Sequence, residues 1–157
     1  MAVTPTGITV ESLYNAYKTD IFRFALAMVR NVQDAQDITG EVFCKAHEKL
    51  HRLRDAQKAK VWLLSIARNL AVDMYRRRAP VNIYRQPPEP QTPGPFEFVQ
   101  VVECLALPDR QIVTLRFVGG LTHDEIAKVL HMTSAQVRKR YSRALQKIKL
   151  FLEEDHE

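Results

Sequence analysis

Two helix starts stand eleven residues apart in one short segment, and they restrict the fold of this chain more than any other feature. Thr122 is followed three positions later by Glu125, and Thr133 is followed in the same way by Gln136. In each pair, the threonine hydroxyl can accept a hydrogen bond from the later backbone N–H, and the later side chain can accept one from the threonine N–H. The first helix can therefore occupy only about residues 123–130. A short helix, a tight turn and a longer helix make a helix-turn-helix.

The longer helix, residues 134–152, separates apolar from basic side chains. Val137, Tyr141 and Ile148 belong to an apolar set that recurs at helical spacing, so one face is predicted to pack. The opposite face is cationic, with short polar residues near the helix start, as in a helix that reads the DNA major groove. A solvated basic face is the alternative, but the two spaced helix starts favour DNA binding. The candidates for DNA contact are Ser134, Gln136, Arg138, Lys139, Arg140 and Arg143.

The first half of the chain predicts three long helices, at about residues 9–30, 34–50 and 59–78. In the second of them, charged residues form one straight and mostly acidic row. Two interpretations explain this row: a solvated face, or a surface for a basic partner. The charge pairs within the row include both attractive and repulsive ones, which favours the partner. The candidate residues are Asp34, Asp37 and Glu41. Gly40 lies in mid-helix, where it costs about 1 kcal/mol relative to alanine, and the sequence gives no reason for it.

The third helix carries a second basic patch formed by Arg68, Arg76, Arg77 and Arg78. Asn69 within it indicates either a break in the helix or an exposed helical residue. After it, residues 79–97 hold six of the eight prolines. Because proline removes backbone donors and favours extended chain, we expect a linker there. The predicted fold class is therefore all-α: two small helical domains, residues 9–78 and 98–152, are joined by a Pro-rich linker, and the second contains the helix-turn-helix.

The remaining features argue against catalysis, metal binding and membrane insertion. The chain has 157 residues, a hydrophobic fraction of 46% and a formal net charge of +5, which suits a polyanionic partner. Cys44 and Cys104 are expected to be buried thiols, and the scattered histidines form no ligand set, so we predict no metal site and no cofactor. With no signal peptide and no long apolar run, we expect a cytoplasmic protein that is not an enzyme.

Three segments, residues 34–50, 61–78 and 107–149, together carry a resemblance to a known family. They resemble, in the same order, the extracytoplasmic-function sigma factors, the two-domain minimal class of bacterial sigma-70 initiation factors. The resemblance covers most of both predicted domains. It implies an RNA polymerase sigma factor that binds core polymerase, recognises the −35 and −10 promoter elements and promotes promoter melting.

For the N-terminal domain, the resemblance implies docking on the clamp helices of the polymerase β′ subunit and melting of the −10 element. Asp34, Asp37 and Glu41 fall where the family meets the clamp. Residues 67–69 fall where the family has a specificity loop that holds a flipped-out base, and Asn69 offers both a donor and an acceptor to a base edge. Trp62 is explained equally well as a core residue. The residues implied for the −10 element are Trp62, Arg68, Asn69, Arg76, Arg77 and Arg78.

For the C-terminal domain, the resemblance implies that the helix from Ser134 enters the major groove of the −35 element and that an apolar surface sits on the polymerase β flap. Ser134, Gln136, Arg138 and Lys139 would then lie near the bases, and Arg140 and Arg143 on phosphates. An anti-sigma protein is the usual regulator of such factors, although the sequence does not show one.

Two departures from the family pattern stand out: Gly40 replaces a common glutamine, and His131 replaces a turn glycine at a position that often needs a positive φ. Two other readings compete with the sigma factor. An ordinary helix-turn-helix regulator should have a ligand pocket or a phosphoacceptor aspartate in residues 34–78, and neither is evident. The second alternative is an interaction protein that does not bind DNA, and the basic helix from Ser134 argues against it.

Overall fold

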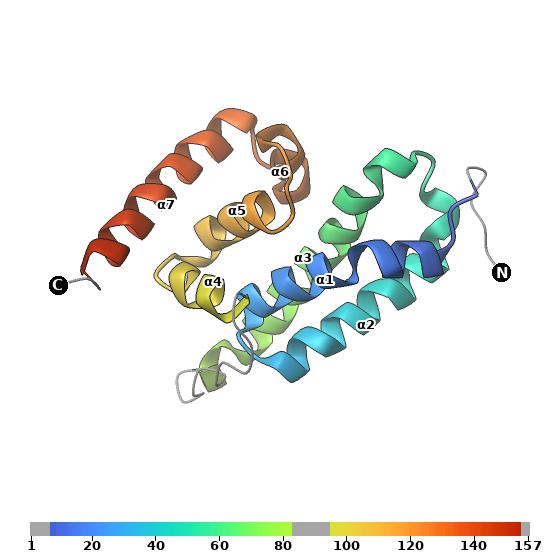
Figure 1. The fold of residues 1–157 in the computed structure, drawn as a ribbon, viewed down its shortest axis with the longest axis horizontal. Coiled ribbons are helices and arrows are strands. Elements are labelled where there is room, and N and C mark those ends of the chain that lie inside the picture. Colours follow the sequence, from blue (N-terminus) through green and yellow to red (C-terminus); the bar gives the residue numbers. More distant parts are fainter. Residues whose placement is uncertain (1–6, 83–94, 155–157) are drawn as a thin grey trace.

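Helices form all the regular structure in the described part of the chain, which is residues 7–82 and 95–154 of this computed structural model. Side chains are described for residues 7–77 and 98–154. The predicted all-α class is confirmed. In chain order (Figure 1), the helices are α1 (Val10–Val29), α2 (Val32–Lys49), the short 3-10 turns η1 (Leu50–Arg52) and η2 (Ala56–Lys58), α3 (Ala59–Asn82), α4 (Pro95–Val102), α5 (Leu107–Phe117), α6 (His123–Leu130) and α7 (Ser134–Glu154).

The N-terminal module, α1–α3, owes its geometry to caps at the ends of its helices. Thr9 and Ser12 exchange hydrogen bonds that begin α1, with 3.1 Å from the Ser12 nitrogen to the Thr9 hydroxyl. Arg30 ends α1 in the left-handed conformation, with φ of 56°. Asn31 then begins α2 at once, because its side-chain oxygen accepts the Asp34 N–H at 2.9 Å. This rapid reversal lets α1, α2 and α3 contact one another.

The C-terminal module, α4–α7, contains the predicted helix-turn-helix at the predicted residues. In α6, the Glu125 nitrogen donates to the Thr122 hydroxyl at 3.1 Å and the Glu125 carboxylate accepts the Thr122 N–H at 2.9 Å. In α7, Thr133 and Gln136 form the same pair at 3.1 and 3.0 Å. His131 ends α6 with φ of 56°, so this position has the left-handed backbone expected of it. Both capping boxes are therefore confirmed.

The α3 helix is continuous from Ala59 to Asn82, and two expectations about it are wrong. It continues past the expected end at Arg78 and through Pro80, because a proline near a helix end removes only one backbone donor. It also has no loop at residues 67–69. Ala67 is fully buried, so a regular helix keeps its apolar row in the core, and Asn69 is an exposed helical residue.

The segment between the two modules is described only at its edges. The chain at residues 79–82 belongs to α3, and α4 begins at Pro95. Residues 83–94 of the expected linker lie outside the described residues. The domain limits at 78 and 98 stay predictions.

The cysteines contradict the expectation of two buried thiols. Cys44 is exposed and Cys104 is partly exposed. Cys44 directly follows the buried residues Val42 and Phe43, and the helical rotation of about 100° per residue turns it to the outside of α2. Apolar residues that are neighbours in sequence therefore do not guarantee burial of the next one.

The two modules pack against each other. The α1 and α3 helices lie between α2 on one side and the C-terminal module on the other, where α1 contacts α4 and α5 and α3 contacts α6 (Figure 1). Buried apolar side chains of both modules belong to one hydrophobic cluster, which includes Phe24 and Leu64 from the first module and Ile112 and Ile126 from the second. None of the described helices is long and apolar enough to span a membrane.

Candidate nucleic-acid interface

The α7 helix lies along an outer edge of the molecule (Figure 1), and its basic side chains are exposed. Val137 and Ala144 are buried on its inner side, so apolar packing fixes its orientation. A row of cations on a helix of fixed orientation can follow a phosphate backbone. The exposed basic residues include Arg138, Lys139, Arg140 and Arg143, as the sequence predicted.

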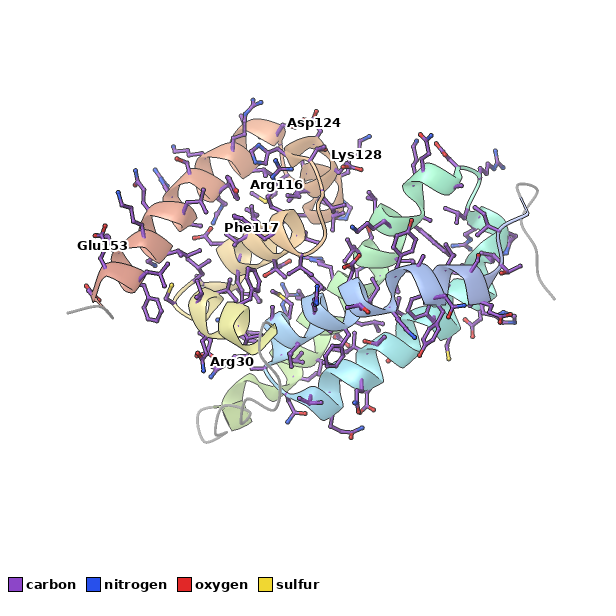
Figure 2. All side chains as sticks on the ribbon, viewed as in Figure 1. Arg30, Arg116, Phe117, Asp124, Lys128 and Glu153 are labelled. Atoms are coloured by element: carbon purple, nitrogen blue, oxygen red, sulfur yellow. The ribbon has the colours of Figure 1, made fainter. Side chains whose placement is uncertain are left out.

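The two polar residues at the start of α7 already have partners within the fold. The Ser134 hydroxyl donates to the carboxylate of Asp124, which Figure 2 labels on α6. The side-chain amide oxygen of Gln136 accepts the Thr133 N–H at 3.0 Å. The side-chain oxygen of Gln136 therefore maintains the cap, and its amide N–H groups can donate to another acceptor.

Arg140 is tied to the neighbouring helix by an ion pair with Asp109, at 3.4 Å and with Arg140 47% exposed. An exposed pair of this kind contributes little stability, so it leaves Arg140 free to exchange the carboxylate for a phosphate. The ion pair with Asp109 determines where the Arg140 guanidinium lies in the free protein.

Exposed apolar side chains lie on the C-terminal module outside the basic row. Phe117, labelled in Figure 2 at the end of α5, is 59% exposed, and its ring lies 6.3 Å from that of Tyr141. Leu150 on α7 is 60% exposed. Isolated exposed leucines are ordinary, but an exposed Phe117 ring beside the partly buried Tyr141 is a candidate contact for an apolar partner.

The acidic row on α2 is divided by burial. Asp37 and Glu41 are exposed, whereas Asp34 is only 5% exposed within the first turn of the helix. Gln33 donates to the Asp37 carboxylate at 3.1 Å, and no basic side chain among the described residues pairs with Glu41. The surface open to a basic partner therefore contains Asp37 and Glu41 but not Asp34.

The residues implied for the −10 element occupy one helix but differ in exposure. Trp62 is partly buried, Arg68 is partly buried, and Asn69 is exposed. Burial, and then the charge of Arg76, lower the pKa of Arg68 below its ordinary value, although an arginine stays charged at neutral pH. Arg76 and Arg77 are exposed, and Arg77 pairs with Asp73 at 3.1 Å. The side chain of Arg78 lies outside the described residues.

Sequence reasoning missed a cleft beside Trp62. It has a volume of about 420 Å³ and is lined by Trp62, by η1, η2 and the residues between them, and by α6; the lining includes Arg54, Lys58, Glu125 and Lys128. Residues 51–58 lie between two of the helices predicted from the sequence and belong to no predicted element. The basic residues among them were the available signal, but only the tertiary structure brings them next to the indole and to α6.

Sequence reasoning also missed Gln111, which is 5% exposed on α5. Its side-chain oxygen accepts a hydrogen bond from Arg68 at 2.9 Å, across the boundary between the modules. A glutamine in an amphipathic helix gives no sign of such a contact, because its partner is distant in the sequence.

A helical module with an acidic face and an arginine patch, followed by a module with a capped basic helix-turn-helix, defines a two-module DNA-binding protein. Residues 13–81 match the Sigma-70 region 2 family, and residues 96–148 match the Sigma-70 region 4 family. The chain belongs to the sigma-70 family and, within it, to the extracytoplasmic-function sigma factors, which act in transcription initiation with core RNA polymerase.

Named relatives support this assignment over nearly the whole chain. The chain is 24% identical to the sigma factor SigX of Bacillus subtilis, over 92% of this chain and 84% of SigX. It is 27% identical to SigM of the same organism, over 90% and 94%, and 29% identical to the ferric citrate uptake sigma factor FecI of Escherichia coli, over 96% and 94%.

Two solved structures have the same fold. The sigma factor RpoE of Bartonella quintana, solved with the anti-sigma factor NepR, has a TM-score of 0.75 and 18% identity, over 91% of this chain and 96% of that one. CnrH, solved with the cytosolic domain of CnrY, has a TM-score of 0.73 and 21% identity, over 93% and 88%.

Proposed function

We propose that this chain binds core RNA polymerase and directs it to promoters by reading a −35 element with α7 and a melted −10 element with α3. The single observation that carries the proposal is the capped helix-turn-helix whose second helix exposes Arg138, Lys139, Arg140 and Arg143. A DNA-reading helix needs a fixed start and a cationic flank, and α7 has both.

At the −35 element, the start of α7 enters the major groove. Arg138 and Lys139 lie nearest the bases, together with Ser134 and the amide group of Gln136. Arg140 and Arg143 bind phosphates. The exposed ring of Phe117, which lies beside the partly buried Tyr141, contacts the β flap of the polymerase; its exposure supports this role.

At the −10 element, Asn69 offers its amide to a flipped base, and Trp62 and the arginines at 68 and 76–78 hold the strand around it. Asp37 and Glu41 bind the clamp helices of β′, and their exposure on α2 supports this role. Asp34 belongs to the same proposed row, and its burial means that it supports the start of α2 rather than meeting the clamp directly.

The protein works by differential binding and not by bond chemistry, because its affinity for melted DNA stabilises the open promoter. It acts in the cytoplasm, where the polymerase is. An anti-sigma protein is proposed as its regulator, on the support of the complexes in which the two solved relatives were determined.

The test combines co-elution of the purified chain with a bacterial core RNA polymerase and run-off transcription on a promoter library. We expect a stable complex and transcripts with defined start sites, whose promoters share two elements. Tight binding to duplex DNA without binding to a cognate core would instead identify an ordinary helix-turn-helix regulator.

A further inference from the structure

The cleft beside Trp62 has an apolar floor. Its apolar lining consists of Leu53, Val61 and Trp62, which come from the segment after η1 and from the first turn of α3. Leu53 is 4% exposed, and Val61 and Trp62 are half-buried against the core, so packing fixes the position of the floor. The volume of about 420 Å³ lies within the range of about 300–1,000 Å³ that is typical of small-molecule sites.

Four cationic side chains surround this floor, and all of them are exposed. Three come from residues 52–58, and the fourth is Lys128, which Figure 2 labels on α6. None of the four forms an ion pair or a side-chain hydrogen bond within the described part of the chain. Cations that gather without partners raise the local positive potential and attract a polyanion. The four residues are Arg52, Arg54, Lys58 and Lys128.

Two acidic residues also line the cleft, but both carboxylates already accept backbone hydrogen bonds. Asp55 accepts the Gln57 N–H at 2.9 Å and begins η2. Glu125 accepts the Thr122 N–H at 2.9 Å in the capping box of α6. Neither acid pairs with a cation among the described residues, and two carboxylates cannot balance four cations. The cleft is therefore net positive around an apolar floor.

This combination suits a ligand that has an aromatic part and several negative charges. The face of an indole stacks on a nucleobase, and every base has a face for this contact. Arginine and lysine side chains bind phosphate oxygens through charge-assisted hydrogen bonds. A free phosphate would leave the apolar floor unused, and an uncharged ring would leave the cations unpaired. A nucleotide with several phosphates, and with a purine for the larger stacking area, uses both parts of the cleft.

The polar residues proposed for the −10 element lie further along α3. At about 1.5 Å per residue, Asn69 is about 10 Å from Trp62 along the helix axis, and Arg76 is about 21 Å away. Among the described residues proposed for that element, only Trp62 lines the cleft. A DNA strand at Asn69 and Arg76 therefore does not explain the four cations beside Trp62. These cations fit a separate ligand.

We propose that the cleft beside Trp62 binds a purine nucleoside polyphosphate, with the base stacked on the indole and the phosphates held by Arg54, Lys58 and Lys128. The inference goes beyond the proposed function, because binding of this ligand involves neither polymerase nor promoter. It also has a consequence for that function. The nucleotide occupies Trp62, which is proposed to help hold the melted strand, so nucleotide and strand compete for the same indole.

The test uses the fluorescence of the full chain, because Trp62 is its single tryptophan and reports on this cleft directly. The free chain is titrated with adenosine triphosphate, with inorganic tripolyphosphate and with a single-stranded DNA oligonucleotide. Lys58→Glu and Lys128→Glu each reverse one charge, on opposite walls of the cleft. Lys149→Glu makes the same change at an exposed position on α7 and is the matched control. Circular dichroism confirms that each variant keeps its helices.

We expect adenosine triphosphate to quench the fluorescence in a saturable way. Each cleft variant should weaken the apparent affinity about tenfold or more, because an attractive charged contact becomes a repulsive one. The Lys149→Glu control should stay within about twofold of the wild type, since solvent and salt screen a distant charge. Tripolyphosphate, which has no base to stack, should bind about tenfold more weakly than the nucleotide.

The absence of any saturable change with adenosine triphosphate would overturn the proposal. Equal affinity for tripolyphosphate would overturn it too, because the indole would then take no part. An equal loss in the Lys149→Glu control would reduce the effect to general attraction by positive charge, and a cleft that binds the oligonucleotide but not the nucleotide would belong to the DNA strand. None of these titrations contains polymerase, so such a failure leaves the proposed function standing, and a failure to bind core leaves this site standing.

Discussion

Several residues proposed to read DNA already form contacts within the free protein. Gln136 completes a helix cap, Arg68 joins two modules, and Arg140 pairs with Asp109. Binding must replace these contacts by contacts of similar chemistry, which reduces the net gain from each one. Arg138 and Lys139 are exposed and have no such partner among the described residues, so they should show the largest effects on promoter affinity.

Substitution of Arg138 by alanine should weaken binding to the −35 duplex by about 1–3 kcal/mol and relax preference at one base pair, because a bidentate base contact is lost. Competition binding against single-base variants of the duplex measures both effects. Lys149→Ala is the matched control, since it removes the same charge nearer the end of α7. Equal losses in the two variants would show that Arg138 contributes only general attraction to phosphate.

Asn69→Ala should leave binding to core polymerase unchanged and alter the preference for −10 sequences. Asn69 is exposed on α3, so its removal should disturb little packing. Run-off transcription on a library of −10 sequences gives the preference, and co-elution gives core binding. Loss of the complex with core would instead assign Asn69 a structural role.

Gly40→Ala should raise the free energy of unfolding by about 0.5–1 kcal/mol. Gly40 lies inside α2 without a positive φ, and an added Cβ would meet nothing within 4 Å. The gain comes from the lower backbone entropy of alanine in the unfolded chain and its higher helix propensity. Urea unfolding followed by circular dichroism measures it, and a loss of stability would mean that α2 is strained at this position.

At the scale of the element, α6 and α7 each begin with a capping box. The α6 helix is too short to be stable alone, so its capping box and its burial of Ile126 must act together. The turn that follows requires His131 in the left-handed conformation, at a cost that glycine would avoid. The start of α7, the helix proposed to read DNA, is therefore held by a few hydrogen bonds, in addition to the apolar packing of its inner side.

Thr133→Ala should lower the free energy of unfolding by about 1 kcal/mol and also reduce affinity for the −35 duplex. The hydroxyl that accepts the Gln136 N–H is lost, and the start of α7 is then less fixed. Ser142→Ala, at an exposed position within α7, is the control: it should leave the affinity unchanged and should not lower the stability, because alanine has the higher helix propensity. A loss of stability with unchanged affinity would show that the cap does not position the reading residues.

On the scale of the whole molecule, the packing of the two modules combines apolar and polar contacts of opposite character. Leu64 and Gly119 meet closely, while Arg110 is buried without full hydrogen bonding. The boundary between the modules therefore has both closely packed and incompletely hydrogen-bonded contacts. Its polar contacts use residues with no other proposed role, apart from Arg68.

Gly119→Ala should lower the free energy of unfolding by roughly 1–3 kcal/mol, because overpacking forces a backbone or side-chain shift. The added Cβ would lie 2.6 Å from the Leu115 carbonyl oxygen and 2.9 Å from the Leu64 methyl. Thermal unfolding monitored by circular dichroism gives the change, and Gly40→Ala is a contrasting control of opposite sign. A stability equal to that of the wild type would show that the α5–α6 turn adapts freely.

The sequence by itself determined the helices, the helix-turn-helix and the family, because these depend on local signals. Caps such as Thr122 with Glu125, and the apolar spacing of α7, act between residues close in the chain, and the structure has them where they were predicted. The basic row of α7 was predictable for the same reason, since residues on one helical face follow from spacing.

Only the tertiary structure decided which of the predicted residues are available. The burial of Asp34, the uninterrupted α3 at Asn69, the exposure of Cys44 and the bond from Arg68 to Gln111 all depend on which helices meet. Packing determines burial and the hydrogen bonds between distant segments, and neither can be predicted from a local sequence pattern. The physical reason is that the periodicity of a helix shows which of its residues share a face, but not which other element packs against that face. Only the folded chain determines that.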